Sequence, residues 1–199
     1  SRPIDSSNMD LSHWKVLAKH IGKHYESYDG FVILHGSDTM SYTASALSFM
    51  LENLTKPVVL TGSQLPIGDL RTDAKENLIT SIQIAALREG GHSVVQEVCL
   101  YFENRLYRGN RTTKMSAEQF QAFDSPNYPA LGSSGVHLRI LREYLWQPDG
   151  RKGLKVHTDL DNRIGLLKLF PGMHPDWVKA QLECSSLKGL VLESYGAGN

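Results

Sequence analysis

Four short polar segments hold the side chains that could carry out chemistry. They are rich in hydroxyl groups, and they add the carboxylate of Asp38 and the amine of Lys114. A pocket built from them could bind a small zwitterion, because Asp38 would pair with an ammonium while hydroxyls and helix N-terminal N–H groups would bind a carboxylate. The segments are Asp5-Ser6-Ser7-Asn8, His35-Gly36-Ser37-Asp38-Thr39, Gly62-Ser63-Gln64 and the basic stretch 105–114.

The same residues could instead activate a hydroxyl group for nucleophilic attack. Desolvation and neighbouring cations can lower the pKa of a lysine until it acts as a base at neutral pH, so a hydroxyl, Asp38 and Lys114 in contact would suit this chemistry. A structural role stays open for each of them. Asp38 and Thr39 could cap a helix that begins at Met40. Lys114 could lie in a solvated basic loop, and His35 could be a hydrogen-bonded structural histidine.

No sequence motif points to a metal or a nucleotide cofactor. His20 and His24 have the spacing of a zinc-binding helix, but the glutamate of H-E-x-x-H is missing, so we interpret them as surface histidines. The chain contains no G-x-G-x-x-G, no Walker loop and no C-x-x-C. We therefore predict neither a cofactor nor a metal site.

The elements that must position the polar segments alternate between apolar runs and amphipathic stretches. The predicted helices cover 11–27, 40–54, 73–88 and 117–123. The predicted strands cover 30–34, 57–61 and 94–102, with a polar loop at 105–115. This alternation predicts an α/β fold with an open parallel sheet, in a flavodoxin-like arrangement. Ligands bind beyond the carboxyl ends of such strands, where three of the polar segments begin.

The alternation breaks after the sequence Pro126-Asn-Tyr-Pro129, which suggests more than one domain. We predict a first domain at 1–142, a linker at 143–163 with a turn at Pro148-Asp-Gly150, and the start of a second, smaller α/β domain at 164–199. A strand that runs into the turn Gly196-Ala-Gly-Asn199 normally feeds a helix. Both ends of the chain therefore look like cuts inside a larger protein.

Composition narrows the class of protein. The 199 residues carry 21 basic and 21 acidic side chains, so the net charge is zero, which argues against a nucleic-acid or anionic-membrane partner. Hydrophobic residues make up 41%, which is enough for a packed core. The cysteines Cys99 and Cys184 lie in apolar runs, and we predict reduced core residues of a cytoplasmic protein.

Several segments resemble the bacterial-type L-asparaginase family, in the branch of cytoplasmic, type I enzymes. The resemblance covers essentially the whole chain in the family's order. The matching segments are Asp5-Ser-Ser-Asn-Met9, Val32-Ile-Leu-His-Gly-Ser-Asp-Thr-Met40, Leu47-Ser-Phe-Met-Leu-Glu-Asn53, Lys56-Pro-Val-Val-Leu-Thr-Gly-Ser63, Arg108-Gly-Asn-Arg-Thr-Thr-Lys114 and Ser194-Tyr-Gly-Ala-Gly-Asn199.

The resemblance implies hydrolysis of L-asparagine to L-aspartate and ammonia, through a threonine nucleophile and a covalent acyl-enzyme. It assigns a catalytic triad to Ser37, Asp38 and Lys114. It also implies contacts of Ser6 and Ser7 with the α-carboxylate and α-amino end of the substrate. Asp38 would hold the substrate ammonium, and Ser63 would lie beside the reacting amide. No cofactor is implied, and the partners would be L-asparagine and further copies of the chain, in a homodimer or homotetramer.

Three departures from the family pattern have consequences. The Thr-Gly-Gly-Thr motif of the primary nucleophile is absent from these 199 residues, so we expect the isolated chain to be inactive. Position 37 is serine where the family usually has threonine, which frees χ1 and should affect the rate only modestly. Glu193 stands where a type I enzyme has an arginine in an allosteric asparagine site, so we predict that asparagine is no allosteric activator.

Other functions stay open on the sequence alone. The chain could be a non-catalytic amino-acid-binding α/β module, which needs the same pocket without a nucleophile. It could be a relative that acts on glutamine or on the amide of a tRNA-bound amino acid. A Ser/His/Asp hydrolase built on Ser37, His35 and Asp38 is disfavoured, because neighbours on one tight loop do not easily form an in-line triad.

Overall fold

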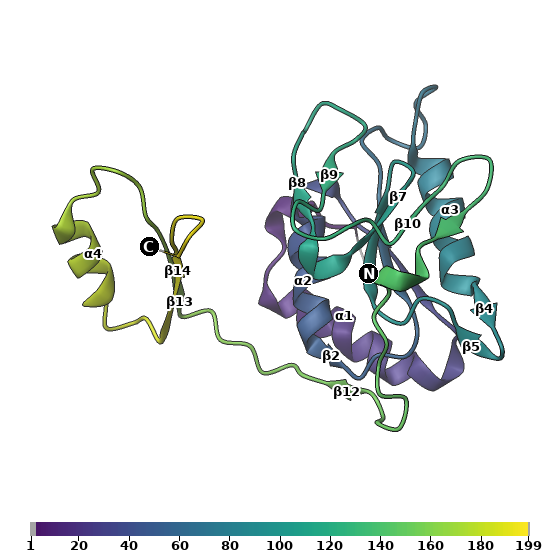
Figure 1. Ribbon diagram of the computed structural model, residues 1–199, viewed down its shortest axis with the longest axis horizontal. Coiled ribbons are helices and arrows are strands. Elements are labelled where there is room, and N and C mark those ends of the chain that lie inside the picture. Colours follow the sequence, from purple (N-terminus) through teal and green to yellow (C-terminus); the bar gives the residue numbers. More distant parts are fainter. Residues whose placement is uncertain (1–2, 199) are drawn as a thin grey trace. The chain divides into compact units, whose positions relative to one another are not determined.

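The structure is a computed structural model that describes residues 3–198 (Figure 1). The chain divides after Thr158 into two compact units, which are described separately below. Asn199, which the family resemblance places near a partner's active site, lies outside the described residues. Within them, no helix is both long enough and apolar enough to cross a lipid bilayer.

A six-stranded mixed sheet forms the centre of the first unit. Three buried or half-buried apolar runs form its parallel part, in the order β1 (Phe31–Leu34), β3 (Val58–Thr61) and β6 (Val98–Phe102). Ile33 lies beside Leu60, and Leu60 lies beside Leu100. The sheet then continues with antiparallel strands, which the prediction of an all-parallel sheet did not include. They are β7 (Arg105–Arg108), β10 (Gly132–Ser133) and β11 (Arg139–Ile140).

Helices cover the sheet, and the α/β fold class is confirmed. The helices of the first unit are α1 (Leu11–His24), α2 (Met40–Met50) and α3 (Ala74–Ala86). Both α2 and α3 pack on β3 and β6, and Figure 1 shows α3 on the opposite side of the sheet from α2. On the α3 side, Ile84 joins a cluster with Val59, Cys99 and Tyr101, all of them buried.

Three of the four helices predicted for this unit are present, and each of the three is shorter than predicted. A 3₁₀ turn at Tyr25–Ser27 replaces the last residues predicted for α1. The predicted helix 40–54 ends at Met50, because β2 (Leu51–Glu52) follows and Asn53 takes a left-handed φ of 62°. That conformation ends a helix, and asparagine tolerates it better than most residues.

The stretch predicted as a polar loop at 105–115 is mostly ordered strand. Glu103 and Asn104 have φ values of 44° and 65°, which makes a tight two-residue turn between β6 and β7. Leu106 and Tyr107 are buried on the returning strand, so their apolar contacts outweigh the flanking arginines. The two-residue strand β8 (Thr113–Lys114) then ends this stretch.

The helix predicted at 117–123 is absent, and this prediction is wrong. Ser116 instead accepts the backbone N–H groups of Glu118 and Gln119 through its hydroxyl, which forms a turn. β9 (Phe123–Asp124) pairs with β8, and Phe123 packs edge-on against Phe102 at 5.0 Å between ring centroids. Burial of this aromatic ring in a strand therefore outweighs the local helical pattern.

Part of the segment predicted as a linker, 143–163, pairs with the first unit. β12 (Lys155–Val156) lies antiparallel to β2, and the His157 N–H donates to the Met50 carbonyl at 2.8 Å. Another short pair lies at the end of α3. It joins β4 (Arg88–Glu89) to β5 (His92–Ser93).

The second unit is a small β-α-β arrangement. Parallel strands β13 (Ile164–Lys168) and β14 (Gly189–Glu193) flank α4 (Pro175–Leu182) along the sequence, within the segment 164–199 that was predicted to begin an α/β domain. Cys184, just after α4, is exposed, so its prediction as a core residue is wrong, whereas Cys99 is fully buried. Both thiols are free.

Candidate active site

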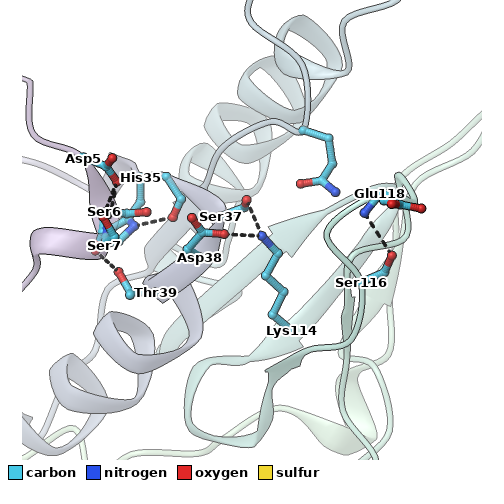
Figure 2. Close-up of polar contacts among 12 residues, drawn as sticks. Asp5, Ser6, Ser7, His35, Ser37, Asp38, Thr39, Lys114, Ser116 and Glu118 are labelled. Carbon is cyan, nitrogen blue, oxygen red and sulfur yellow. Dashed lines mark hydrogen bonds and ion pairs between the residues drawn. The ribbon is translucent and has the colours of Figure 1, made fainter.

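Ser37, Asp38 and Lys114 are in direct contact, although Lys114 lies 77 residues from Ser37 in the sequence. The Lys114 Nζ donates to Ser37 Oγ at 2.9 Å and to Asp38 Oδ1 at 2.6 Å (Figure 2). The lysine side chain is only 16% exposed, whereas the Asp38 side chain is 64% exposed. The Lys114 ammonium thus bonds both a hydroxyl and a carboxylate, and the exposed carboxylate is accessible to a charged ligand.

Two loops bring these residues together. Ser37 and Asp38 belong to a 3₁₀ turn, Ser37–Thr39, which leads from β1 directly into α2. Lys114 lies on β8, whose pairing with β9 fixes its direction. Neither Asp38 nor Thr39 caps α2 with its side chain, so the structure does not support the capping alternative.

The opening segment lies against the same turn. A 3₁₀ turn at Ser6–Asn8 follows Asp5, and the Thr39 hydroxyl donates to the Ser6 carbonyl at 2.7 Å. Ser6 is buried beside Gly36, where an added Cβ would lie 2.6 Å from Ser6 Oγ. Only glycine therefore permits this approach.

Ser7 is placed differently from Ser6. Its backbone N–H and its hydroxyl both donate to Asp5 Oδ1 at 2.9 Å, and these contacts lower the pKa of Asp5. The Ser7 hydroxyl is therefore already engaged, and Ser7 is exposed. Figure 2 shows Asp5, Ser6 and Ser7 on the side of Ser37 opposite to Lys114.

A cavity of about 680 Å³ lies beside these segments. Ser6, His35, Gly36 and Ser63 contribute to its wall, together with apolar side chains from α1 and α3. The three residues of the Ser37–Lys114 contact do not line it. The structure thus gathers Ser37 and Asp38 around Lys114, and Ser6 and Ser63 around this cavity, whereas Ser7 belongs to neither group.

The loop that carries Ser63 is held by the start of α3. Backbone N–H groups of Gln64 and Leu65 donate to Asp73 Oδ1 at 3.0 and 3.2 Å. The buried Asn77 donates to the Gly62 carbonyl at 2.9 Å and to Asp73 Oδ2 at 3.0 Å. Among the residues that the structure describes, the Ser63 hydroxyl has no hydrogen-bond partner, so it remains available in the cavity wall.

The His35 ring makes no hydrogen bond or ion pair with Ser37 or Asp38 among the described residues. Its ring nitrogens lie 2.7 Å from the Gly36 carbonyl and 2.8 Å from Thr43 Oγ1. Burial lowers the pKa of His35, and the contact with Gly36 partly opposes this. The Ser/His/Asp hydrolase alternative therefore lacks the hydrogen bond on which it depends.

No metal site is evident in residues 3–198. They contain no group of three or more His, Cys, Asp or Glu side chains that could hold an ion. His20 and His24 stack their rings at 6.4 Å between centroids.

Comparison with known proteins places the chain in a family. Residues 1–145 match the family model described as Asparaginase, N-terminal. The chain belongs to the asparaginase family. It is 50% identical over 196 residues to L-asparaginase 1 of Escherichia coli (strain K12), a match that covers 98% of this chain and 56% of the relative. It is also 48% identical over 196 residues to the 60 kDa lysophospholipase of Homo sapiens, covering 98% and 33%.

A solved asparaginase agrees with this placement. The structure of L-asparaginase I from Vibrio cholerae superposes with a TM-score of 0.87 at 41% identity, and the match covers 98% of this chain and 58% of that one. The predicted resemblance to type I bacterial asparaginases is therefore confirmed. The chain spans about half the length of the bacterial relatives and a third of the lysophospholipase.

Two residues that hold the Ser63 loop were not predicted from the sequence as candidate site residues. Asp73 and Asn77 were interpreted only as part of a helix, although they hold the Ser63 loop. The signal was the spacing of two polar residues in the first turn of a helix that follows a polar loop. Asn77 Oδ1 also accepts the Glu103 N–H at 3.2 Å, which links that loop to the β6–β7 turn.

Proposed function

We propose that this chain is part of an amidohydrolase that converts L-asparagine to L-aspartate and ammonia. The observation that supports it most directly is the Lys114 ammonium bonded to both Ser37 and Asp38. The family resemblance assigns a hydroxyl–carboxylate–lysine triad to these three residues. Their contact across 77 residues of sequence agrees with that assignment.

The substrate would be held by its two charged ends. The exposed carboxylate of Asp38 is available to the α-ammonium, and the hydroxyl of Ser6 lies next to the same turn. Ser63 would lie beside the side-chain amide. Ser7 would contact the substrate only after exchanging its bonds with Asp5, so we assign it the smaller share of binding.

Lys114 and Asp38 would move the protons. While Lys114 donates to Ser37, the serine hydroxyl keeps its own proton free for donation to a ligand. The carboxylate of Asp38 accepts a hydrogen bond from the Lys114 ammonium at 2.6 Å. When the substrate ammonium binds, it would share this carboxylate with Lys114.

The covalent step would need a further group. In the reaction that the resemblance implies, a threonine hydroxyl attacks the amide carbon and ammonia leaves. Water then attacks the resulting ester, which releases L-aspartate. The 199 residues contain no Thr-Gly-Gly-Thr, so we assign the attack to a segment outside them. We expect these 199 residues by themselves to release no ammonia.

Assembly, location and regulation complete the proposal. We propose a homodimer or homotetramer in the cytoplasm, with neither nucleic acid nor membrane as a partner. The domain division at 1–142, 143–163 and 164–199 is likewise a proposal.

Glu193 stands where the resemblance places an arginine of an allosteric asparagine site, and it forms an ion pair with Lys168 at 3.6 Å. Because the charge at this position is reversed, we propose that asparagine is no allosteric activator. We therefore expect rates that rise hyperbolically with the asparagine concentration.

The test is ammonia release by the intact natural protein with L-asparagine or L-glutamine. We expect a higher kcat/KM for L-asparagine. A preference for L-glutamine would favour the glutamine-directed alternative. Because one relative is named a lysophospholipase, a lysophospholipid is assayed in parallel, and hydrolysis of it in place of both amides would overturn the proposal.

The binding-module alternative has its own test. Calorimetry measures binding of L-aspartate to the intact protein, alongside the ammonia assay. Tight binding with no turnover of either amide would favour the module. Turnover that Lys114→Met abolishes would favour the amidohydrolase.

A further inference from the structure

Three linked hydrogen bonds lie next to the turn that carries Ser37. Trp14 Nε1 donates to Thr43 Oγ1 at 2.9 Å, and Thr43 Oγ1 lies 2.8 Å from His35 Nε2. The other ring nitrogen, Nδ1, lies 2.7 Å from the Gly36 carbonyl oxygen. These hydrogen bonds connect α1, α2 and the end of β1, and the last of them ends at Gly36, the residue before Ser37.

The Trp14 N–H donor, the Gly36 carbonyl acceptor and a neutral His35 ring together fix the direction of every bond. A carbonyl oxygen only accepts, so His35 Nδ1 must carry a proton. Burial lowers the pKa of His35, which favours the neutral ring. Nε2 of a neutral ring with a proton on Nδ1 is an acceptor, so the Thr43 hydroxyl donates to it. The donors then run from Trp14 to Thr43, from Thr43 to His35, and from His35 to Gly36.

Gly36 is the residue where this orientation affects the site. Its backbone lies so close to Ser6 that an added Cβ would fall 2.6 Å from Ser6 Oγ and 2.7 Å from Ser6 Cβ. Ser37 follows Gly36 directly, and Thr39 donates to the Ser6 carbonyl at 2.7 Å. The plane of the Gly36–Ser37 peptide therefore sets where the Ser6 and Ser37 hydroxyls lie relative to each other.

We infer that His35 is a positioning residue, held as the neutral tautomer with its proton on Nδ1. It orients the Gly36–Ser37 peptide and through it the two serine hydroxyls. The consequence for substrate binding rests on the proposed function, in which both hydroxyls serve L-asparagine. The tautomer does not rest on it, because the contact with the Gly36 carbonyl requires the proton on Nδ1 and burial of the ring favours the neutral form.

Protonation of His35 would disturb this arrangement. A second proton on Nε2 would turn that nitrogen into a donor, and the Thr43 hydroxyl could no longer donate to it. Among the described residues, no charged side chain makes a hydrogen bond or ion pair with the ring. The titratable groups on the neighbouring segments pair elsewhere: Asp5 with Ser7, His13 of the same cavity wall with Asp10, and Asp38 with Lys114.

Nitrogen NMR of the imidazole tests the tautomer in the intact protein without any need for activity. With ¹⁵N-labelled histidine at neutral pH, we expect the Nδ1 signal of a protonated nitrogen and the Nε2 signal of an unprotonated one. On acidification, the ring should take up its second proton below pH 6.5, the ordinary pKa of a histidine. A proton on Nε2 of the neutral ring, or a pKa at or above 6.5, would overturn the assignment.

Two substitutions separate the two ends of the ring. His35→Asn keeps a nitrogen donor near the position of Nδ1, whereas His35→Gln keeps a polar group near Nε2 and loses the bond to Gly36. Loss of one hydrogen bond of ordinary strength predicts a roughly threefold to tenfold higher KM for L-asparagine in the glutamine variant of the intact protein. We expect the KM of His35→Asn to stay nearer that of the wild type, and the KM of the control variant His20→Asn to be unchanged. Equal losses in both His35 variants would overturn positioning through Gly36.

The two proposals fail in different ways. If the intact wild-type protein neither binds nor hydrolyses L-asparagine, the proposed function fails. The imidazole signals, and the backbone signals of Ser6 and Ser37 in the His35→Asn and His35→Gln variants, still decide the role of His35. We expect those signals to shift more in the glutamine variant, and no difference between the variants would contradict the inference.

Discussion

Two groups of hydroxyls flank Gly36, and they differ in what holds them. On one side, Ser37 is joined by hydrogen bonds to an ion pair whose carboxylate is 64% exposed. On the other side, Ser6 is only 6% exposed and is held by the tight approach of Gly36 and by a bond from Thr39 to its carbonyl. Hydrogen bonds to charged groups therefore hold Ser37, whereas close packing holds Ser6.

In the proposed function, this difference would separate two tasks within one site. A group held by an exposed ion pair responds to a charged ligand, because the ligand competes for the same carboxylate. A group held by packing keeps its place whether or not a ligand is present. Changes of charge should therefore affect the proton-handling side, and changes of volume should affect the cavity side.

The largest expected effect comes from removing the charge. Lys114→Met keeps much of the length and apolar stem of the side chain but removes the donor to Ser37 and Asp38. Loss of a general acid–base group lowers kcat by about 10²–10⁴-fold. Steady-state ammonia release by the intact protein measures it, with the exposed Lys152→Met as the matched control. A kcat within threefold of the wild type would show that Lys114 handles no proton.

The cavity side should respond instead to a single added methyl group. Gly36→Ala would place a Cβ 2.6 Å from Ser6 Oγ, so Ser6 or the Ser37 turn must move. Overpacking of this kind costs about 1–3 kcal/mol of folding stability, and we expect KM to rise more than kcat falls. The control is Gly135→Ala, where an added Cβ has nothing within 4 Å. Equal behaviour of the two variants would contradict a packed Ser6.

The loop of Ser63 offers a third comparison, because buried hydrogen bonds hold it. Asn77→Ala would leave the Gly62 carbonyl, Asp73 and the Glu103 N–H without this partner. Unsatisfied buried groups predict a loss of about 1–3 kcal/mol in the free energy of unfolding. Urea denaturation measures it. Asn110→Ala, at an exposed position, should change it little, and a similar loss there would argue against a special role for Asn77.

The sequence predicted the parts of the fold that depend on local pattern. Continuous apolar runs located β1, β3 and β6, and the polar residues after them located Ser37 and Ser63. The pairing of β7 with β6 was missed because it depends on a two-residue turn at Glu103 and Asn104 and on burial of residues between arginines. The turn lacks the glycine that usually marks such a hairpin, and Leu106 is buried by residues far away in the sequence, which include Val59 and Ile84, so local spacing does not reveal this strand.

The site shows the same division. The types of residue indicated that a hydroxyl, Asp38 and Lys114 in contact would suit one reaction, and the family resemblance identified the hydroxyl as that of Ser37. The unequal positions of Ser6 and Ser7 could not be predicted, since both are serines in one polar segment. Only the approach of Gly36 to one and of Asp5 to the other distinguishes them.

The smallest expected effect concerns Ser7, which is held by charge although it lies next to the packed Ser6. The Ser7 backbone N–H and then its hydroxyl lower the pKa of Asp5 below its ordinary value of 3.8. Their contribution to stability is therefore complete above pH 3.8 and is lost as the pH falls through the lowered pKa. The Ser7 amide signal in NMR should follow this titration, and Asp5→Asn should abolish it. The Ser6 amide should move less, because packing and the bond from Thr39 hold it, and an equal shift would remove the distinction between the two serines.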